Sequence, residues 1–163
     1  MSPSPEWLAL GRRAVACPAW TWRRGVSLVG GDLVVDVLAS SMRVSLRDGR
    51  WVRIFYWEPG EPVEVGPVPD LQDPLTLGWL LALVRQAWVD PTLAPSLMDF
   101  GEEDHEGSKG LRWVLTTMNE SFFPDVDFED HPSEAALLVR ALELAPRAAT
   151  SPSSEPLGDH HEL

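Results

Sequence analysis

The sequence predicts a single α+β domain that spans residues 1–145. Two observations indicate this fold class. Residues 26–57 contain four short runs of β-branched and aromatic side chains separated by turn residues, as in an antiparallel β-meander. Residues 74–88 form a helix pattern that is apolar on almost every side, so the rest of the chain must bury it. We expect a meander of four or five strands and one late strand to pack on this central helix, with further helices at both ends.

The size of the chain supports one hydrophobic core. The chain has 163 residues, among them eight Trp and five Phe, and can bury a core without disulfides or metal ions. Its longest apolar run, Leu77–Val84, is far shorter than the ~20 residues that a membrane-spanning helix needs. The N-terminus shows no basic region followed by a hydrophobic segment, so no secretory signal is visible. We therefore expect a cytoplasmic protein that does not bind membranes.

Residues 5–16 predict the first helix. Ser4 suits the N-cap and Pro5 the first helical position, and the helix should end before Pro18. Cys17 is the only cysteine of the chain, which excludes an internal disulfide and a zinc site built on paired thiolates. We interpret it as a small buried hydrophobe.

The meander is predicted between residues 26 and 57. Asp48-Gly49 is a strong two-residue hairpin signal, because a type I′ turn needs positive φ at both central residues. This turn fixes a register in which Val44 faces Arg53 across the hairpin. The expected strands are residues 26–29, 33–38, 42–47 and 50–57.

The same register divides the hairpin into two faces. The first face is mostly apolar and should pack inward, with Arg53 as its exception. It consists of Met42, Val44, Leu46, Trp51, Phe55 and Trp57. The second face is basic near the turn and apolar away from it, so we expect it to be half covered. It consists of Arg43, Ser45, Arg47, Arg50, Val52, Ile54 and Tyr56.

Two further helices are predicted after the meander. Asp73 and Pro74 suit the start of the central helix, which should end near Trp88. Ser133 is suited to cap a last helix over residues 134–145. The remaining predictions are a short edge strand at 63–65, a loop at 91–110, the late strand at 111–118 and a disordered tail at 146–163.

Charge is distributed unevenly along the chain. The formal net charge is −12, yet up to Trp57 eight Arg outnumber four acidic residues. From Glu58 onward five basic residues face 21 acidic ones. A protein of this charge repels nucleic acid and anionic membranes over most of its area, so we predict that it binds neither. The alternatives for the acidic surface are a protein partner with a basic surface, or solubility alone.

No sequence motif assigns an enzymatic activity. The chain has no glycine-rich phosphate loop, no Gly-x-Ser-x-Gly elbow and no His-Glu-x-x-His helix. General acid–base catalysis would need carboxylates held in a cleft with separated pKa values, and the sequence identifies no such pair. We predict no catalytic, cofactor-binding or metal-binding residue, and no cofactor.

Two acidic segments keep open the alternative of a small metal-dependent hydrolase. Residues 125–130 alternate carboxylates as a calcium loop begins, but Asp130 stands where a glycine is needed and Ala136 where a bidentate Glu is needed. His105 lies among the carboxylates of residues 102–106, in a predicted loop. Because nothing implies groups that would orient these ligands, adventitious metal binding is the expectation there.

The segment Trp20-Thr-Trp22-Arg-Arg24 is the best candidate for a contact surface. Trp and Arg dominate the energetics of protein interfaces. Pro18 and Gly25 place the segment in a loop or at the entry of a strand, where side chains can be displayed. The alternative is that both indole rings fill the core while the arginines extend over the surface. The protein-contact candidates are Trp20, Trp22, Arg23 and Arg24.

Three motifs follow one another in a distinctive order: Ala16-Cys17-Pro-Ala-Trp20-Thr-Trp22, then Pro69-Asp-Leu-Gln-Asp-Pro74-Leu-Thr-Leu-Gly78-Trp-Leu-Leu-Ala-Leu-Val-Arg85-Gln-Ala-Trp88, then Ala141-Leu-Glu-Leu-Ala-Pro146. With the meander between the first two, this order resembles a family of small uncharacterised bacterial proteins, many of them associated with phages or prophages. The resemblance covers about residues 14–146. The chain departs from it at Trp79, where a smaller residue is expected, and in the loop at 99–110. The resemblance implies a phage-related context, but no activity, cofactor or catalytic residue.

These observations favour a non-enzymatic cytoplasmic accessory protein of a phage-derived or mobile element that binds another protein. The alternative is the metal-dependent hydrolase with its acidic, histidine-containing loop. The sequence leaves the oligomeric state and the identity of any partner open.

Overall fold

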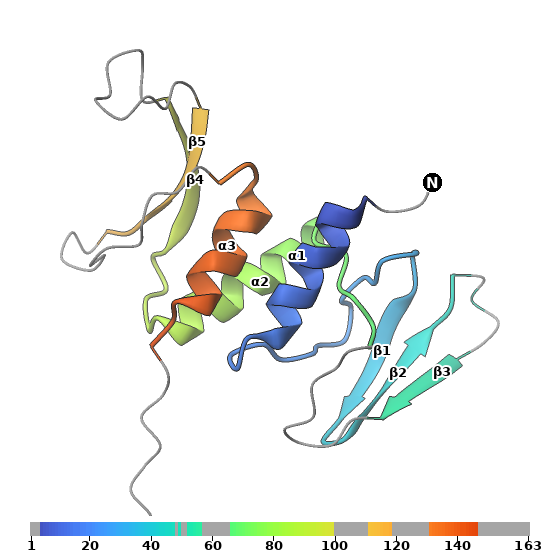
Figure 1. Cartoon of the computed structure of the whole chain (residues 1–163). Coiled ribbons are helices and arrows are strands. Elements are labelled where there is room, and N and C mark those ends of the chain that lie inside the picture. The colour runs from blue at the N-terminus through green and yellow to red at the C-terminus, as the bar shows by residue number, and fades with distance from the viewer. Residues whose placement is uncertain are drawn as a thin grey trace, which may run out of the picture.

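The computed structural model describes residues 4–47, 49, 52–56, 66–99, 111–118 and 131–146. Three helices and two antiparallel sheets make up this part of the chain, so the fold is α+β, as predicted. Figure 1 shows the helices in the middle of the molecule, with the three-stranded sheet on one side and the two-stranded sheet on the other. The elements in chain order are α1 (Pro5–Ala16), β1 (Leu33–Leu38), β2 (Ser41–Ser45), β3 (Val52–Tyr56), α2 (Pro74–Ala87), β4 (Ala94–Asp99), β5 (Leu111–Thr116) and α3 (Glu134–Glu143).

All three helices begin at the residues that the capping signals predict. The Asp73 carboxylate accepts hydrogen bonds from Thr76 N at 2.8 Å and from Thr76 Oγ1 at 2.9 Å. Ser133 Oγ accepts from Ala136 N at 3.1 Å. Ser4 occupies the predicted N-cap position of α1, but unlike Asp73 and Ser133 it makes no side-chain capping hydrogen bond. The start of α1 relies instead on a proline at the first helical position, whose fixed φ suits a helix.

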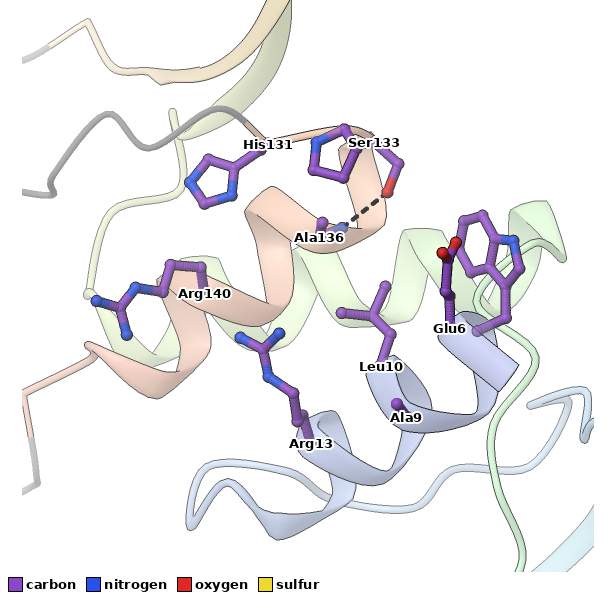
Figure 2. A pocket seen from close by; sticks show the side chains of 10 residues that line it. Glu6, Ala9, Leu10, Arg13, His131, Ser133, Ala136 and Arg140 are labelled. Atoms are coloured by element: carbon purple, nitrogen blue, oxygen red, sulfur yellow. Dashed lines mark hydrogen bonds between the residues drawn. The ribbon is translucent and has the colours of Figure 1, made fainter. Parts of the chain in front are cut away.

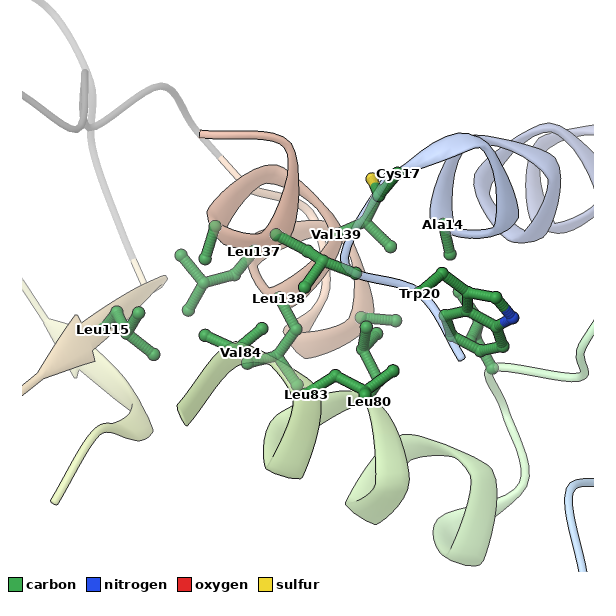
Figure 3. Packing of buried hydrophobic residues seen from close by; sticks show 14 of the residues in the cluster. Ala14, Cys17, Trp20, Leu80, Leu83, Val84, Leu115, Leu137, Leu138 and Val139 are labelled. Carbon is green, nitrogen blue, oxygen red and sulfur yellow. The ribbon is translucent and has the colours of Figure 1, made fainter. Parts of the chain in front are cut away.

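The main hydrophobic core lies between the helices (Figure 3). Leu80 and Val84 of α2 and Leu138 of α3 are each 0% exposed. Burying side chains of this size contributes about 1.5–3 kcal/mol each. Both α1 and α2 pack on α3. The central helix is therefore buried along one face, formed by Thr76, Leu80, Leu83 and Val84, whereas its Leu75 is 75% exposed. Its chief neighbour is α3 and not the meander.

The three-stranded sheet has the order β1-β2-β3. Val44 pairs with Arg53, which confirms the register predicted from the hairpin turn, and Gly49 has a φ of 67°. The first predicted strand is wrong: in place of a strand at 26–29 there are two isolated bridges, Ser27 to Leu33 and Leu28 to Pro69. The described part of the meander therefore has three strands.

The inner face of this sheet forms a second, smaller hydrophobic core. It contains buried Val34, Met42 and Val44 of the sheet, together with Val26 and Leu28 from the segment before β1. Two residues, Trp22 and Trp79, pack against both cores.

The opposite face of the sheet is exposed, and the expectation that it is half covered is wrong. Val52, Ile54 and Tyr56 are 57%, 46% and 77% exposed. Leu33 and Leu38 of β1 are exposed as well. Within the described residues, the second core fills only the inner side of the sheet. We call these five apolar residues, together with Asp36 and Arg43, the outer sheet face.

The two-stranded sheet replaces part of a predicted loop. Residues 94–99 form β4, which pairs with β5 so that Leu97 lies opposite Trp113. The loop prediction for 91–110 is thus wrong for these residues, whereas the late strand at 111–118 is confirmed as β5. The β4 sequence Ala-Pro-Ser-Leu-Met-Asp has weak strand propensity, so pairing with β5 and packing on α3 decide its conformation.

Asp90 organises the turn between α2 and β4. Its side chain is nearly buried, and Oδ1 accepts from Thr92 N at 2.8 Å and from Thr92 Oγ1 at 2.6 Å. Oδ2 accepts from the hydroxyl of Thr117, just after β5. The hydroxyls of Thr117 and Thr92 lower the pKa of the Asp90 carboxyl. The carboxylate therefore connects the residue Thr92, just before β4, with Thr117, just after β5.

Several predictions fall outside the described residues. These are the edge strand at 63–65, the acidic loop at 102–106, the carboxylates at 125–130 and residues 147–163 of the tail. Among the residues that are described, no helix is long and apolar enough to cross a membrane.

Candidate functional site

The segment of contact candidates lies between the two hydrophobic cores. Trp20 is 8% exposed and belongs to the helical core. Its ring meets that of Trp22 edge-to-face, with ring centroids 5.4 Å apart and an interplanar angle of 86°. Trp22 is partly buried against both cores. The prediction of Trp20 as a contact residue is therefore wrong. Its ring fills the core, as in the alternative given for this segment, and is not available to a partner.

Trp79 of α2 holds this segment in place. Its Nε1 donates a hydrogen bond to the carbonyl oxygen of Thr21 at 2.8 Å. The guanidinium of Arg23 lies over the same indole, with Cζ 4.9 Å from the ring centroid. A cation over a Trp face is attracted by roughly 0.5–1 kcal/mol at an exposed site. The large side chain at position 79 thus anchors the predicted contact segment.

Arg24 lies next to the outer sheet face. Together with residues of that face it lines a shallow hollow of about 590 Å³. The other lining residues are Val35, Asp36, Arg43, Val52 and Ile54. The hollow therefore combines Arg24, a predicted contact residue, with the exposed apolar side chains of Val52 and Ile54 in β3, which were not predicted as contact residues.

The surroundings of the outer sheet face carry more positive than negative charge. The exposed arginines of this face are Arg24, Arg43 and Arg47, whereas Arg53 pairs with Val44 and lies on the inner side of the sheet. Described acidic residues there are Asp32, which accepts a hydrogen bond from Arg47 N at 3.0 Å, and Asp36. An apolar face with cations around it stands out on a chain whose net charge is −12.

Cys17 has no nucleophilic character. It is 6% exposed, and its Sγ lies 3.3 Å from the carbonyl oxygen of Arg13. Burial is the main cause that raises the pKa of the thiol to about 11. Since the thiolate is the reactive form, a thiol of this pKa is inert near neutral pH. The interpretation of Cys17 as a buried hydrophobe is confirmed.

Metal chemistry finds no support in the described part of the chain. No group of three or more His, Cys, Asp or Glu side chains that could hold a metal ion occurs there. The carboxylates and His105 of the hydrolase alternative lie outside the described residues.

Comparisons of the chain with protein-family models, with curated proteins and with solved structures found no match. The surface itself is therefore the ground for a functional hypothesis. The sequence signal that could have identified it is the alternation of Val52, Ile54 and Tyr56 on one side of β3.

Proposed function

We propose that the protein is a non-enzymatic accessory protein that binds another protein through the outer sheet face and Arg24. The observation that carries this proposal is the exposure of five large apolar side chains on one side of a single three-stranded sheet. Contiguous exposed apolar surface is uncommon on monomeric proteins and marks sites of interaction. Arg is also among the residues that contribute most to protein interfaces.

The proposed contact segment of the partner is apolar and acidic. Apolar side chains would cover Val52 and Ile54, and a carboxylate would pair with Arg24 or Arg43 at the edge of the hollow. A partner with a basic surface, expected from the overall charge, would have to bind elsewhere. The acidic residues on which that expectation depends lie largely outside the described part of the chain.

The proposal includes the setting that the sequence suggests. We infer a cytoplasmic protein of a phage-derived or mobile element, on the basis of the family resemblance that the three sequence motifs carry. The hydrolase alternative makes a separate prediction, namely that the purified protein contains one tightly bound divalent metal ion per chain.

A capture experiment with matched variants tests the proposed surface. Tagged wild-type protein and an Ile54→Glu variant are used as bait in a lysate of the native host, and the captured proteins are identified by mass spectrometry. We expect a stoichiometric partner on the wild type that Ile54→Glu loses, because a carboxylate there replaces apolar contact with an uncompensated charge. Leu111→Glu is the control, since Leu111 is 66% exposed but belongs to the two-stranded sheet.

Charge adds a second arm to this experiment. Arg24→Ala combined with Arg43→Ala should weaken binding of the purified partner and reduce its salt dependence. The proposal fails if the partner is retained equally by wild type and Ile54→Glu, or if Leu111→Glu loses it as well. Circular dichroism of each variant establishes that its fold is intact.

A further inference from the structure

A second concave region lies between α1 and α3 (Figure 2). It is a groove of about 720 Å³. Pockets for small molecules measure roughly 300–1,000 Å³. The groove is thus large enough for a molecule of ten or more non-hydrogen atoms, and none of its lining residues belongs to the outer sheet face.

The middle of the groove is apolar. Trp7, Ala9 and Leu10 of α1 line one side, and Ala136 of α3 lines the other. Trp7 and Leu10 also pack against the helical core, which holds their side chains in place. A ligand would therefore meet a largely preformed apolar wall.

One end of the groove is cationic. Arg13 and Arg140 both line it, and both are close to a single carboxylate, that of Glu143. Arg13 makes two hydrogen bonds to Glu143 at 2.8 and 2.9 Å, whereas Nη1 of Arg140 lies 3.6 Å from it. Nε of Arg140 is buried and has no hydrogen-bond partner among the described residues. Two guanidinium groups thus share one counter-charge, which leaves about one positive charge in excess when His131, which also lines the groove, is neutral.

The other end of the groove is acidic. Glu6 lines it at the start of α1, as Figure 2 shows. Glu6 and Arg13 are seven positions apart on α1, which corresponds to about 10 Å along a helix that rises 1.5 Å per residue. The groove therefore has a cationic end, an apolar middle and an acidic end.

We propose that this groove binds a small molecule with a single carboxylate group and an apolar body. The carboxylate would accept hydrogen bonds from Nη1 of Arg13, which forms neither of the two bonds to Glu143, and from the guanidinium of Arg140. The apolar body would lie against Leu10 and Ala136. A single excess positive charge favours a monoanion over a phosphate dianion, and Glu6 disfavours a second acidic group at the far end. The ligand class is thus an aromatic or aliphatic monocarboxylate.

Binding of defined probes to the full chain tests the proposal. The probes are 2-naphthoate, its uncharged counterpart 2-naphthylmethanol and naphthalene-2,6-dicarboxylate, with affinities from calorimetry and the site mapped by NMR shifts of the Ala9 and Ala136 amides. We expect the monocarboxylate to bind about tenfold more tightly than the alcohol, the usual order for one charge-assisted contact. We also expect the dicarboxylate to bind more weakly than the monocarboxylate, and Glu6→Gln to reduce that difference.

Four variants locate the site. Arg140→Gln should weaken naphthoate binding by about tenfold, whereas Arg12→Gln, which removes an exposed arginine outside the groove, should not. Ala9→Leu should block binding by filling the groove. Its control is Ala16→Leu, at an exposed position of the same helix that does not line the groove.

Several outcomes would overturn the proposal. These are no saturable binding of naphthoate at millimolar concentration, equal affinity for acid and alcohol, or binding that Ala9→Leu leaves intact. Selective binding of a peptide through its C-terminal carboxylate, with none of naphthoate, would also count against a small-molecule ligand.

Discussion

Arg13 and Glu143 are 130 positions apart in the chain, and their side chains form a fork of two hydrogen bonds, Nε to Oε1 at 2.8 Å and Nη2 to Oε2 at 2.9 Å. The pair connects α1 with the end of α3. The hydrogen bond and charge of Arg13 lower the pKa of the Glu143 carboxyl. Because the Arg13 side chain is 52% exposed, solvent screens the pair and its contribution is modest.

A double-mutant cycle should detect this pair as a pH-dependent coupling. Arg13→Gln, Glu143→Gln and the double variant should give a coupling free energy of about 0.5–1 kcal/mol at pH 7 from urea unfolding. The pKa of Glu143 is lower in the folded state, so its stabilisation is present above the unfolded value of about 4.5 and is lost as the pH falls through the folded value. We expect no coupling at pH 2. Arg12→Gln is the control, and a coupling that persists in acid would contradict the prediction.

Two glycines should respond in opposite ways to alanine. A Cβ on Gly11 of α1 would lie 2.5 Å from Cγ1 of Val68 and 2.9 Å from the carbonyl oxygen of Pro69. Gly11→Ala should therefore destabilise the protein by about 1–3 kcal/mol, as overpacking does. Gly78 of α2 has open space around its Cα, so Gly78→Ala should stabilise by about 0.5–1 kcal/mol through helix propensity. The thermal unfolding temperatures of both variants test these predictions, and equal changes in Tm would contradict the close approach of Gly11 to Val68 and Pro69.

The stability of the protein should depend on the hydroxyl group of Thr76 and not only on the volume of its side chain. It is 0% exposed, and its Oγ1 accepts from Ser27 N at 2.9 Å while donating to Asp73. Thr76→Val keeps the volume but leaves Ser27 N without this acceptor, at a cost of about 1–3 kcal/mol. Thr76→Ser should recover most of that loss because it restores the hydroxyl. Urea unfolding midpoints measure all three proteins, and a valine variant as stable as wild type would show that the bond is dispensable.

Cys17 should be protected from thiol reagents in the native state. Its thiol is buried and has a pKa of about 11, so little thiolate is present at pH 8. We expect Ellman's reagent to react slowly with the native protein and rapidly in denaturant. Gly11→Ala, which loosens the contact between α1 and Pro69, should accelerate the reaction. Rapid modification of the folded wild type would contradict the burial of this side chain.

Local signals predicted the helix starts and the hairpin register correctly. Asp73 and Ser133 act within one turn of their own helices, and the hairpin signal in the sequence at residues 48–49 was enough to predict the pairing of Val44 with Arg53. Strand β4 was missed because its partner β5 begins 12 positions after β4 ends, and the sequence of β4 itself carries weak signals.

The candidate site was only partly predictable. The sequence identifies Arg24 as a contact residue, but it does not tell whether Trp20 faces the core or a partner, since either use suits a tryptophan. Exposure of Ile54 depends on what packs over the hairpin, and that is decided by elements distant in the chain. The role of Trp79 was not accessible either, because the backbone oxygen that it contacts, on Thr21, lies 58 positions earlier.

Trp22 and Trp79 lie between the two hydrophobic cores, which implies that the two cores can unfold partly independently of each other. Within the described residues these two rings are the side chains that pack against both cores, so they carry much of the apolar contact between the cores. The three-stranded sheet should then exchange its amide hydrogens sooner than the helices, as a separate foldon. A partner bound to the outer sheet face would slow amide hydrogen exchange in the three-stranded sheet and leave the exchange rates of the helices unchanged.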